Sequence, residues 1–320
     1  MMFELSAASV CDYLARRGIE LRNAEELGGG VSNIVVLAET SCGRIVLKQS
    51  LEKLRVADEW LSDRGRIFRE AEAMRVLRPL LPSGAVPEAL FEDESRFLFA
   101  MSGAPAEAMP WKQRLMAGAA SVEDGRRAAA ILGRLIAGTW GSAEAAERFG
   151  DQTVFNQLRI DPYYRTTAAR HPGLGKYFDA LIETSAGRRV ALVHGDFSPK
   201  NLLVWDDRMM AIDFEVIHYG DPSFDAAFLL NHLLIKSNVC KGPVRECARA
   251  FWAALAGFIP AEASWFESAT IAHLGGLLLA RVDGKSPVEY VREEAMKNRL
   301  RGLAREMITS PPKRIEEIFT

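Results

Sequence analysis

The sequence has 320 residues, of which 48% are hydrophobic and 26% are charged. This composition is ordinary for a globular protein and excludes a long disordered chain. With 40 basic and 42 acidic residues the formal net charge is −2, so the chain has no bulk attraction for nucleic acid or for an anionic membrane.

The four cysteines are scattered, and they form neither a Cys-x-x-Cys pair nor a metal-ligand spacing with histidine. This distribution favours a reducing compartment. Residues 1–17 show no basic segment followed by an apolar one, and the longest apolar stretches, such as 274–280, are far shorter than a membrane span. We therefore expect a cytoplasmic protein that does not enter a membrane.

In chain order, the first third of the sequence reads as a small, strand-rich unit. A helix is predicted over residues 6–17, and the glycine-rich segment 28–33 leads into a β-branched run that is typical of a strand. The next predicted elements are strands at 34–38 and 44–49, a helix at 66–77 and a strand at 96–101. Residues 102–110 are rich in Ala, Gly and Pro, which predicts a linker to a second, larger unit.

From residue 111 onward helical periodicity predominates. The predicted helices cover residues 125–139, 224–235, 243–255, 263–280 and 288–308. A strand-like island interrupts them at residues 189–194, 202–205 and 209–214. The pattern predicts an α+β fold with two lobes, a small one built on a sheet and a larger, mainly helical one.

The glycine-rich segment is the first candidate site. Glycines at 28–30, followed by Val31, Ser32 and Asn33, let backbone amides approach an anion closely. The segment is neither a Walker loop nor a Gly-x-Gly-x-x-Gly fingerprint. An ordinary hairpin turn is the alternative interpretation.

Lys48 ends an apolar strand just after this segment. A lysine there can reach phosphates under the turn, and it needs a carboxylate to hold its charge in place. Glu70 lies on the buried stripe of the next helix, where an unpaired carboxylate would be costly, whereas Glu72 falls off that stripe. Glu70 is therefore the predicted partner, and a surface lysine with a helix-edge glutamate is the alternative.

The strongest signal is His-Gly-Asp-x-x-x-x-Asn at residues 194–201, followed by Ile-Asp-Phe-Glu at 212–215. Phosphoryl transfer needs a base that orients the acceptor and oxygen ligands for Mg²⁺ within a few ångströms of each other. Asp196 and Asn201 belong to one loop between two predicted strands, and Asp213 ends an adjacent strand. This spacing fits a base together with a magnesium site.

The ordered set of glycine turn, Lys48, Glu70, Asp196, Asn201 and Asp213 resembles the aminoglycoside phosphotransferase and choline kinase family, which has a protein-kinase-like fold. The resemblance implies a kinase that uses ATP or GTP with Mg²⁺ to phosphorylate a hydroxyl of a small molecule. Asp196 would be the catalytic base. The implied metal ligands are Asn201, Asp213 and Glu215, and the implied nucleotide contacts are Gly29, Gly30, Ser32, Asn33, Lys48, Glu70, Met101, Ser102 and Ala104.

The same resemblance implies a division of labour along the chain. Residues 1–101 would be the nucleotide-binding lobe, 102–110 the hinge, and 111–320 the catalytic and acceptor-binding lobe. It also implies that Asp225 supports the catalytic loop. We expect His194 to brace that loop through hydrogen bonds rather than to transfer a proton.

Two segments, 47–51 and 56–66, are locally similar to methylthioribose kinases, which would place Trp60 near the nucleotide or simply against the small lobe. The chain also departs from those enzymes. They carry Asp-Pro-Glu where this chain has residues 213–215, they lack an Asn at position 201, and they carry a sugar-binding Arg-Arg pair where this chain has His-Leu-Gly-Gly at 273–276.

The acceptor therefore stays open. A methylthioribose-like sugar or another small alcohol leads, with an aminoglycoside, choline, a hydroxy amino acid or a nucleotide-binding pseudokinase scaffold as alternatives. A charged turn predicted after residue 280 contributes the candidate acceptor contacts Arg281, Asp283 and Lys285. Two cations would suit an acidic or phosphate-bearing acceptor, although a solvated loop explains the same residues.

Overall fold

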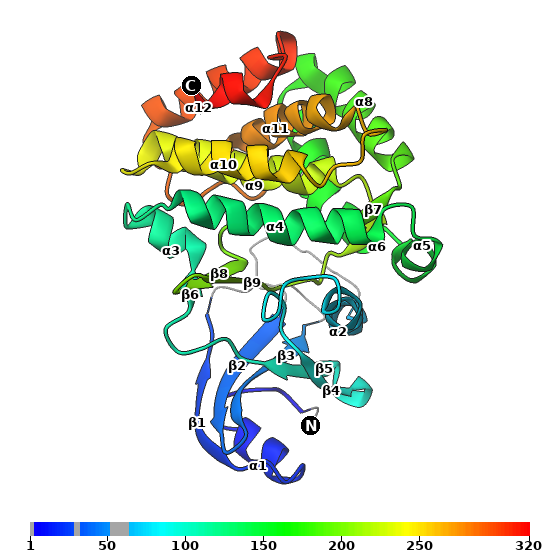
Figure 1. Ribbon diagram of the computed structural model, residues 1–320, viewed down its shortest axis with the longest axis vertical. Coiled ribbons are helices and arrows are strands. Elements are labelled where there is room, and N and C mark those ends of the chain that lie inside the picture. Colours follow the sequence, from blue (N-terminus) through cyan, green and yellow to red (C-terminus); the bar gives the residue numbers. More distant parts are fainter. Residues whose placement is uncertain (1–2, 29–32, 52–63) are drawn as a thin grey trace.

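The computed structural model describes residues 3–28, 33–51 and 64–320, and Figure 1 shows them arranged in two lobes. The smaller lobe, blue to cyan in Figure 1, is built on one antiparallel five-stranded sheet with the strand order β1-β2-β3-β5-β4. Its elements are α1 (Val10–Ala15), β1 (Leu21–Glu26), β2 (Asn33–Thr40), β3 (Gly43–Ser50), α2 (Arg66–Leu77), β4 (Ala89–Asp93), η1 (Glu94–Arg96) and β5 (Leu98–Ser102).

The larger lobe is mainly helical. Its helices are α3 (Trp111–Met116), α4 (Val122–Thr139), α5 (Ala143–Phe149), α6 (Thr153–Phe155), η2 (Asn156–Arg165), α7 (Thr166–Arg170), η3 (Pro172–Leu174), α8 (Gly175–Gly187), α9 (Ser223–Val239), α10 (Val244–Ala256), α11 (Phe266–Asp283), α12 (Glu294–Thr309) and η4 (Ile315–Phe319). Its short strands are β6 (Met109–Pro110), β7 (Ala191–Val193), β8 (Leu202–Trp205), β9 (Arg208–Ala211) and β10 (His218–Gly220).

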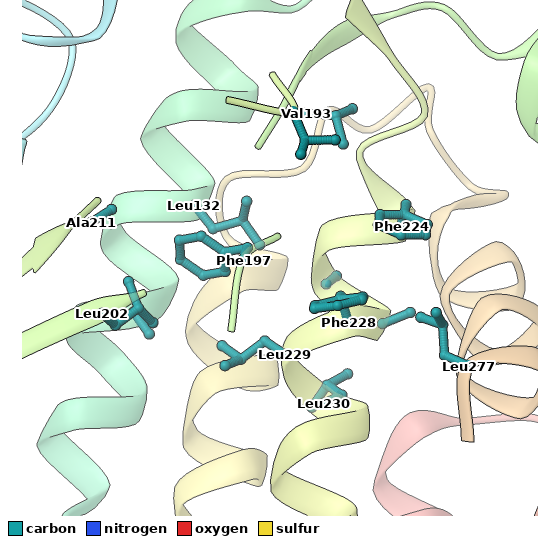
Figure 2. Close-up of a cluster of buried hydrophobic side chains, with 14 of the residues drawn as sticks. Leu132, Val193, Phe197, Leu202, Ala211, Phe224, Phe228, Leu229, Leu230 and Leu277 are labelled. Atoms are coloured by element: carbon teal, nitrogen blue, oxygen red, sulfur yellow. The ribbon is translucent and has the colours of Figure 1, made fainter. Parts of the chain in front are cut away.

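Helix α9 is the centre of the larger lobe. Its residues 223–236 are all buried, and it packs against α10 and α11, while α4 packs on the other side of α10. A helix that is apolar on every side belongs in a core rather than at a surface. Figure 2 shows Phe224, Phe228 and Leu229 of α9 together with Phe197, so the core also holds the segment between β7 and β8.

The predicted α+β fold with a sheet lobe and a helical lobe is confirmed. The sheet of the small lobe ends at Ser102, the first residue of the predicted linker, and the first helix of the large lobe begins at Trp111. The end of that predicted linker is not a free connection, because Met109–Pro110 forms β6, which pairs with β8. The functional division into residues 1–101, 102–110 and 111–320 stays a prediction. In the described part of the chain, no helix combines the length and the apolar character that crossing a bilayer requires.

The structure differs from the predicted elements in several places, and it also contains α3, α5, α6, η2, α7, η3, α8, β6 and β10, for which no separate element was predicted. Strands β1 and β4 were not predicted, because both are edge strands with partly exposed, polar sequences that carry little hydrophobic signal. The first helix begins at Val10 rather than at residue 6, because the Ser6 and Ser9 side chains hydrogen-bond to each other's backbone amides instead.

Two further differences lie near the C-terminus. Helix α11 continues through Arg281 to Asp283, so the predicted charged turn begins only at Gly284, whose N–H donates to the Ala280 carbonyl. Helix α12 begins at Glu294 rather than at residue 288, which leaves 288–293 as an irregular connection with a turn at Glu289 and Tyr290.

Candidate active site

The loop of residues 194–201 joins β7 to β8 and has a tightly specified backbone. Gly195 has φ +76°, and a Cβ atom placed there would lie 2.7 Å from Cγ1 of Val216 and 2.9 Å from its carbonyl oxygen. Only glycine fits such a left-handed, crowded position. Two residues later Phe197 is fully buried among the side chains of α4 and α9 (Figure 2), so this side chain anchors the loop in the core of the large lobe.

Two further side chains, Asp225 and His194, hold this loop through hydrogen bonds. Asp225, in the first turn of α9, accepts the N–H groups of His194 and Gly195 at 2.6 and 2.9 Å. The His194 ring links to the Ile212 carbonyl through Nε2 and accepts the Asp196 N–H at Nδ1. Burial lowers the pKa of His194 to about 4, so the ring is neutral at pH 7. The predicted bracing roles of His194 and Asp225 are confirmed.

Asp196 stands in this loop as an ionised carboxylate. Its Oδ2 atom lies 3.0 Å from Nη2 of Arg159 and 2.8 Å from Nζ of Lys200, and it accepts a hydrogen bond from Asn201 Nδ2 at 2.9 Å. Burial alone would raise the pKa of Asp196, but the charges of Arg159 and Lys200 bring it below its ordinary value. All three of these side-chain contacts fall on Oδ2, and none of them involves Oδ1.

Lys48 connects the two lobes. Its Nζ atom lies 2.7 Å from Oε2 of Glu70 and 2.5 Å from Oδ1 of Asp213, and Glu70 also accepts the Phe214 N–H. Burial acts to lower the pKa of Lys48, but the carboxylates of Asp213 and Glu70 outweigh it and raise that pKa. The predicted Lys48–Glu70 pairing is present, and Asp213 joins it.

Asp213 and Asn201 are the candidate metal ligands. The backbone of Asp213 has φ +70°, a conformation that costs energy outside glycine and is often stored at functional sites. The Asn201 amide nitrogen donates to the carbonyl oxygen and to Oδ2 of Asp196, so its amide oxygen is the atom that suits a metal. The described residues contain no group of three or more His, Cys, Asp and Glu side chains arranged for a metal.

That sparse ligand set fits Mg²⁺ carried by a nucleotide. Magnesium keeps several waters and is typically held by one or two carboxylates together with substrate phosphates, rather than by an all-protein cage. Asp213, with 26% of its side chain exposed, and Asn201 supply the hard oxygen atoms that such an ion prefers. The residues present therefore fit the group, and their role as its ligands stays a prediction.

Glu215 is drawn toward the small lobe. Its Oε2 atom accepts the Asn33 amide at 2.8 Å and pairs with Nε of Arg66, which is 1% exposed, at 3.3 Å. These contacts link Asn33, at the end of the glycine-rich segment, to Glu215 of the large lobe. The predicted metal role of Glu215 has to compete with them and stays a prediction, and Gly29, Gly30, Ser32 and Trp60 lie outside the described residues.

The predicted adenine contacts lie where β5 leads into the linker. The Ser102 N–H donates to the Glu88 carbonyl, and the Ala104 carbonyl accepts from Nη1 of Arg44 at 3.0 Å. Met101 pairs with Val46 in the sheet. Reception of a base by Met101, Ser102 and Ala104 stays a prediction.

The three candidate acceptor contacts separate in space. Asp283 pairs with Arg301, at 2.7 Å, and with His171, at 2.9 Å, beside a groove of about 360 Å³ that Arg170 also lines. Lys285 donates its backbone N–H to the Pro162 carbonyl. Arg281 instead donates to the Tyr163 hydroxyl, at 3.3 Å, and Arg159 lies over the ring of the same tyrosine.

Sequence reasoning missed Arg159 as a neighbour of Asp196. It is held in place by the Gly195 and Leu158 carbonyls, at 2.5 and 2.7 Å, within the helix η2. No motif marks it, because its link to Asp196 is a contact between separate elements. The one available signal was general: a buried catalytic carboxylate requires a cation nearby.

A two-lobed α+β fold with these side chains between the lobes defines the class of protein-kinase-like phosphotransferases. A sequence model described as "Phosphotransferase enzyme family" matches residues 23–266, and the chain belongs to that family.

Three known proteins illustrate the similarity. The chain is 26% identical over 268 residues to methylthioribose kinase 2 of Oryza sativa subsp. japonica, covering 72% of this chain and 62% of that protein. It is 29% identical over 254 residues to the methylthioribose kinase of Pectobacterium carotovorum subsp. carotovorum (strain PC1), covering 69% and 61%. It thus spans less than two thirds of these relatives.

Among solved structures, the streptomycin-ATP-APH(2")-IIa ternary complex superposes with a TM-score of 0.55 at 18% identity, covering 87% of this chain and 91% of that one. At this level of identity the similarity establishes the fold.

Proposed function

We propose that the protein is an ATP-dependent kinase that transfers the γ-phosphate to a hydroxyl of a small acceptor, a methylthioribose-like sugar or another small alcohol. The proposal is supported by two sets of contacts, one that joins the lobes and one within the large lobe. Lys48, anchored on Glu70, faces Asp213 from one lobe, and Asp196 lies on the other lobe beside Asn201. Phosphoryl transfer uses this set of a cation, a metal carboxylate and an acceptor-orienting carboxylate.

The chemistry follows from the roles of these groups. Lys48 binds the α- and β-phosphates and holds the donor in line. Oδ1 of Asp196 accepts the proton of the acceptor hydroxyl as the new oxygen–phosphorus bond forms. The bond from the γ-phosphorus to the bridging oxygen breaks, and its electron pair leaves on the β-phosphate of ADP. The products are ADP, a phosphate ester and the proton on Asp196, which is released to water.

Asn201 and Asp213 would hold Mg²⁺, whose contribution when bound is to neutralise charge on the phosphate oxygens. Arg159 and Lys200 keep Asp196 ionised, and Asp225 keeps its loop in place. The enzyme's contribution is thus positioning and electrostatics, which supply most of the rate acceleration in this class of reaction.

The donor and the surroundings are part of the proposal. ATP is supported by its presence in the solved complex that shares this fold, and GTP is the alternative donor. All four cysteines are free, which supports a reducing, cytoplasmic location. The sugar acceptor is supported by the two relatives, which are named as methylthioribose kinases.

The test is donor consumption by the purified protein with Mg²⁺, ATP or GTP, and a panel of acceptors that includes methylthioribose, other pentoses, amino alcohols, hydroxy amino acids and aminoglycosides. Asp196→Asn is the control, because the amide oxygen can still accept from Arg159 while the base is lost. We expect turnover to fall about 10²- to 10⁴-fold in this variant. Turnover that survives in folded Asp196→Asn would overturn the role of Asp196, and ATP binding without any turnover would indicate a scaffold.

A further inference from the structure

One side of helix α9 leads from the catalytic loop to a buried lysine. Asp225 holds the loop, and Phe228, His232 and Lys236 follow at spacings of three or four residues, which places them on the same face. The Phe228 and His232 rings lie 5.3 Å apart. Arg159, the partner of Asp196, lies 5.9 Å from the Phe228 ring, so the near end of this face adjoins the catalytic carboxylate.

Lys236 is the unusual member of this face. It is 1% exposed, and its Nζ atom donates to the Tyr290 hydroxyl at 3.0 Å and lies 4.7 Å from the centre of that ring. No carboxylate of the described residues lies within ion-pair distance of it. Glu289, the acidic group that influences it, is paired with Lys112. A buried ammonium without a counter-ion is costly unless an anion arrives or the group loses its proton.

Lys236 belongs to a larger set of positive side chains beside the catalytic loop. We define the cationic cluster as Lys112, Arg159, Lys200, Lys236 and Arg281. Its members are linked by contacts: Arg159 and Arg281 lie 5.8 and 5.6 Å from the centre of the Tyr163 ring. The backbone N–H of Lys112 donates to the Pro199 carbonyl in the catalytic loop, and its ammonium lies 5.7 Å from the Tyr290 ring that Lys236 also contacts.

The carboxylates nearby neutralise only part of this charge. Asp196 forms ion pairs with Arg159 and Lys200, and Glu289 forms an ion pair with Lys112. Arg281 donates only to the neutral groups of Tyr163 and Ser286, and its Nε atom is buried without a hydrogen-bond partner. Two cations, Lys236 and Arg281, are therefore left without an acidic partner in the described structure.

His232 lies among the same excess of positive charges. It is 7% exposed and lies between Phe228 and Lys236 on the face of α9. Burial, and after it the charges of the four cluster members other than Arg159, hold the pKa of His232 well below its ordinary value. An uncharged imidazole can donate one N–H without adding to the repulsion.

We propose that the acceptor of this enzyme carries an anionic group, a carboxylate or a phosphate ester, that binds between Lys236 and Arg281 while its hydroxyl meets Asp196. This inference rests on the proposed kinase function and names its substrate class. A cationic acceptor such as an amino sugar or choline would add a positive charge to the cluster. A neutral sugar would leave Lys236 without a counter-ion, whereas an anion would pair with its ammonium form.

The residues around α11 agree with this assignment. The stretch 273–276, where methylthioribose kinases would present a sugar-binding arginine pair, lies buried in α11, and His273 bonds to the Tyr164 hydroxyl at 2.7 Å. Arg281 lies two turns further along the same helix, and its guanidinium lies 5.6 Å from the centre of the Tyr163 ring, which Arg159 also contacts.

The experiment compares acceptors that differ only in charge. Ribose, ribonate and ribose 5-phosphate form one series, and glycerol, glycerate and glycerol 3-phosphate form a second. Each is assayed for phosphorylation with ATP and Mg²⁺, and each is also titrated by calorimetry in the absence of nucleotide. The variants are Lys236→Met, which keeps most of the apolar stem, and Lys176→Met, which removes an exposed lysine of α8 as the matched control.

We expect the carboxylate or phosphate members to be phosphorylated and the neutral members to be poor acceptors. Lys236→Met should lower kcat/KM for the anionic acceptor about 10- to 100-fold, the value of one charge-assisted hydrogen bond, and leave the KM for ATP unchanged. Lys176→Met should match the wild type. Preference for ribonate over ribose 5-phosphate, or the reverse, identifies which anion the cluster binds.

The outcomes separate this inference from the proposed function. Efficient turnover of the neutral acceptors that is insensitive to Lys236→Met would overturn the inference and keep the kinase. Calorimetric binding of an anionic member that Lys236→Met abolishes, without turnover of any compound, would support the anion site and count against the kinase. Absence of anion binding to the wild type would overturn the inference.

Discussion

The Nζ atom of Lys48 in β3 lies 2.5 Å from Oδ1 of Asp213, and this contact joins the sheet of the small lobe to the large lobe across 165 residues of sequence. Glu70 completes the arrangement from α2. The Lys48 ammonium therefore forms ion pairs with one carboxylate from each lobe. A nucleotide with its metal ion would bring negative phosphates to Lys48 and positive charge to Asp213, replacing this contact with matched partners.

Removing the cation from this arrangement should destabilise the fold. Glu70 is fully buried and Lys48 is 4% exposed, so Lys48→Met leaves the Glu70 carboxylate without its ammonium partner. Loss of one member of a buried ion pair typically costs about 3–5 kcal/mol. We expect a decrease of this size in the free energy of unfolding, measured by urea denaturation at pH 7.

The double variant Lys48→Met/Glu70→Leu is the control for that prediction. It removes both charges from the interior, so it should recover most of the lost stability without restoring nucleotide binding. A Lys48→Met protein as stable as the wild type would contradict the buried pairing of Lys48 with Glu70.

Asp213→Ala should uncouple metal from nucleotide. In the wild type we expect ATP with Mg²⁺ at about 100 times its dissociation constant to stabilise the fold by about 2.7 kcal/mol, and chelation of the metal to remove most of this gain. In Asp213→Ala the gain should be small with or without Mg²⁺, because the carboxylate proposed as the metal ligand is removed. Thermal denaturation with ATP, with ATP and EDTA, and without ligand measures both effects, and an unchanged response to Mg²⁺ in the variant would contradict the metal role.

Two glycine-to-alanine substitutions, one in the loop of residues 194–201 and one in α12, should change the stability of the fold in opposite directions. Gly195→Ala combines φ +76° with a Cβ atom 2.7 Å from Val216, so it should lower stability by about 1–3 kcal/mol and displace Asp196, with a matching loss of kcat. Gly302→Ala in α12 meets nothing within 4 Å and should raise stability by about 0.5–1 kcal/mol. Chemical denaturation of both variants gives the comparison, and equal effects at the two sites would contradict the strained loop.

Lys236 predicts a pH dependence of stability. Burial, and then the Lys112 and Arg281 charges, lower its pKa from 10.5 to about 7, although Cys240 and Glu289 oppose this and Tyr290 is its hydrogen-bond partner. Between pH 7 and 10 the unfolded chain therefore binds more protons at this lysine than the folded chain does. The contribution of Lys236 to the free energy of unfolding should rise with pH by up to ~1.4 kcal/mol per unit.

The difference between wild type and Lys236→Met isolates that contribution, because the other titrating groups are common to both proteins. We expect the variant to be more stable than the wild type near pH 7 and its advantage to shrink steadily toward pH 10. Urea denaturation at intervals of half a pH unit measures this trend, and a difference that does not change with pH would show that Lys236 stays charged in the folded protein.

Much of the fold and part of the site followed from local pattern. The strands around Lys48 and the helix that carries Glu70 were predicted from their hydrophobic periodicity, and the structure pairs the two side chains as expected. The edge strands β1 and β4 were not predicted, since their stability comes from pairing with β2 and β5 rather than from their own sequences.

The acceptor side was less accessible to sequence reasoning. Arg281 and Asp283 were grouped as neighbours in one charged turn, but they are part of one helix and contact different partners. Arg159 and Lys236 carried no motif at all. Their significance comes from Asp196 and Tyr290, which reach them from other parts of the fold.

Residues 194–201 and 212–215 are short segments whose spacing fits a base with a magnesium site, and their resemblance to a known family implied a phosphotransferase. The balance of charge around the acceptor depends on distance through space, because ion pairs and desolvation are decided within a few ångströms. Only the tertiary structure shows that Lys236 is buried beside Tyr290 and that Arg281 approaches Tyr163, both without a carboxylate partner in the described chain.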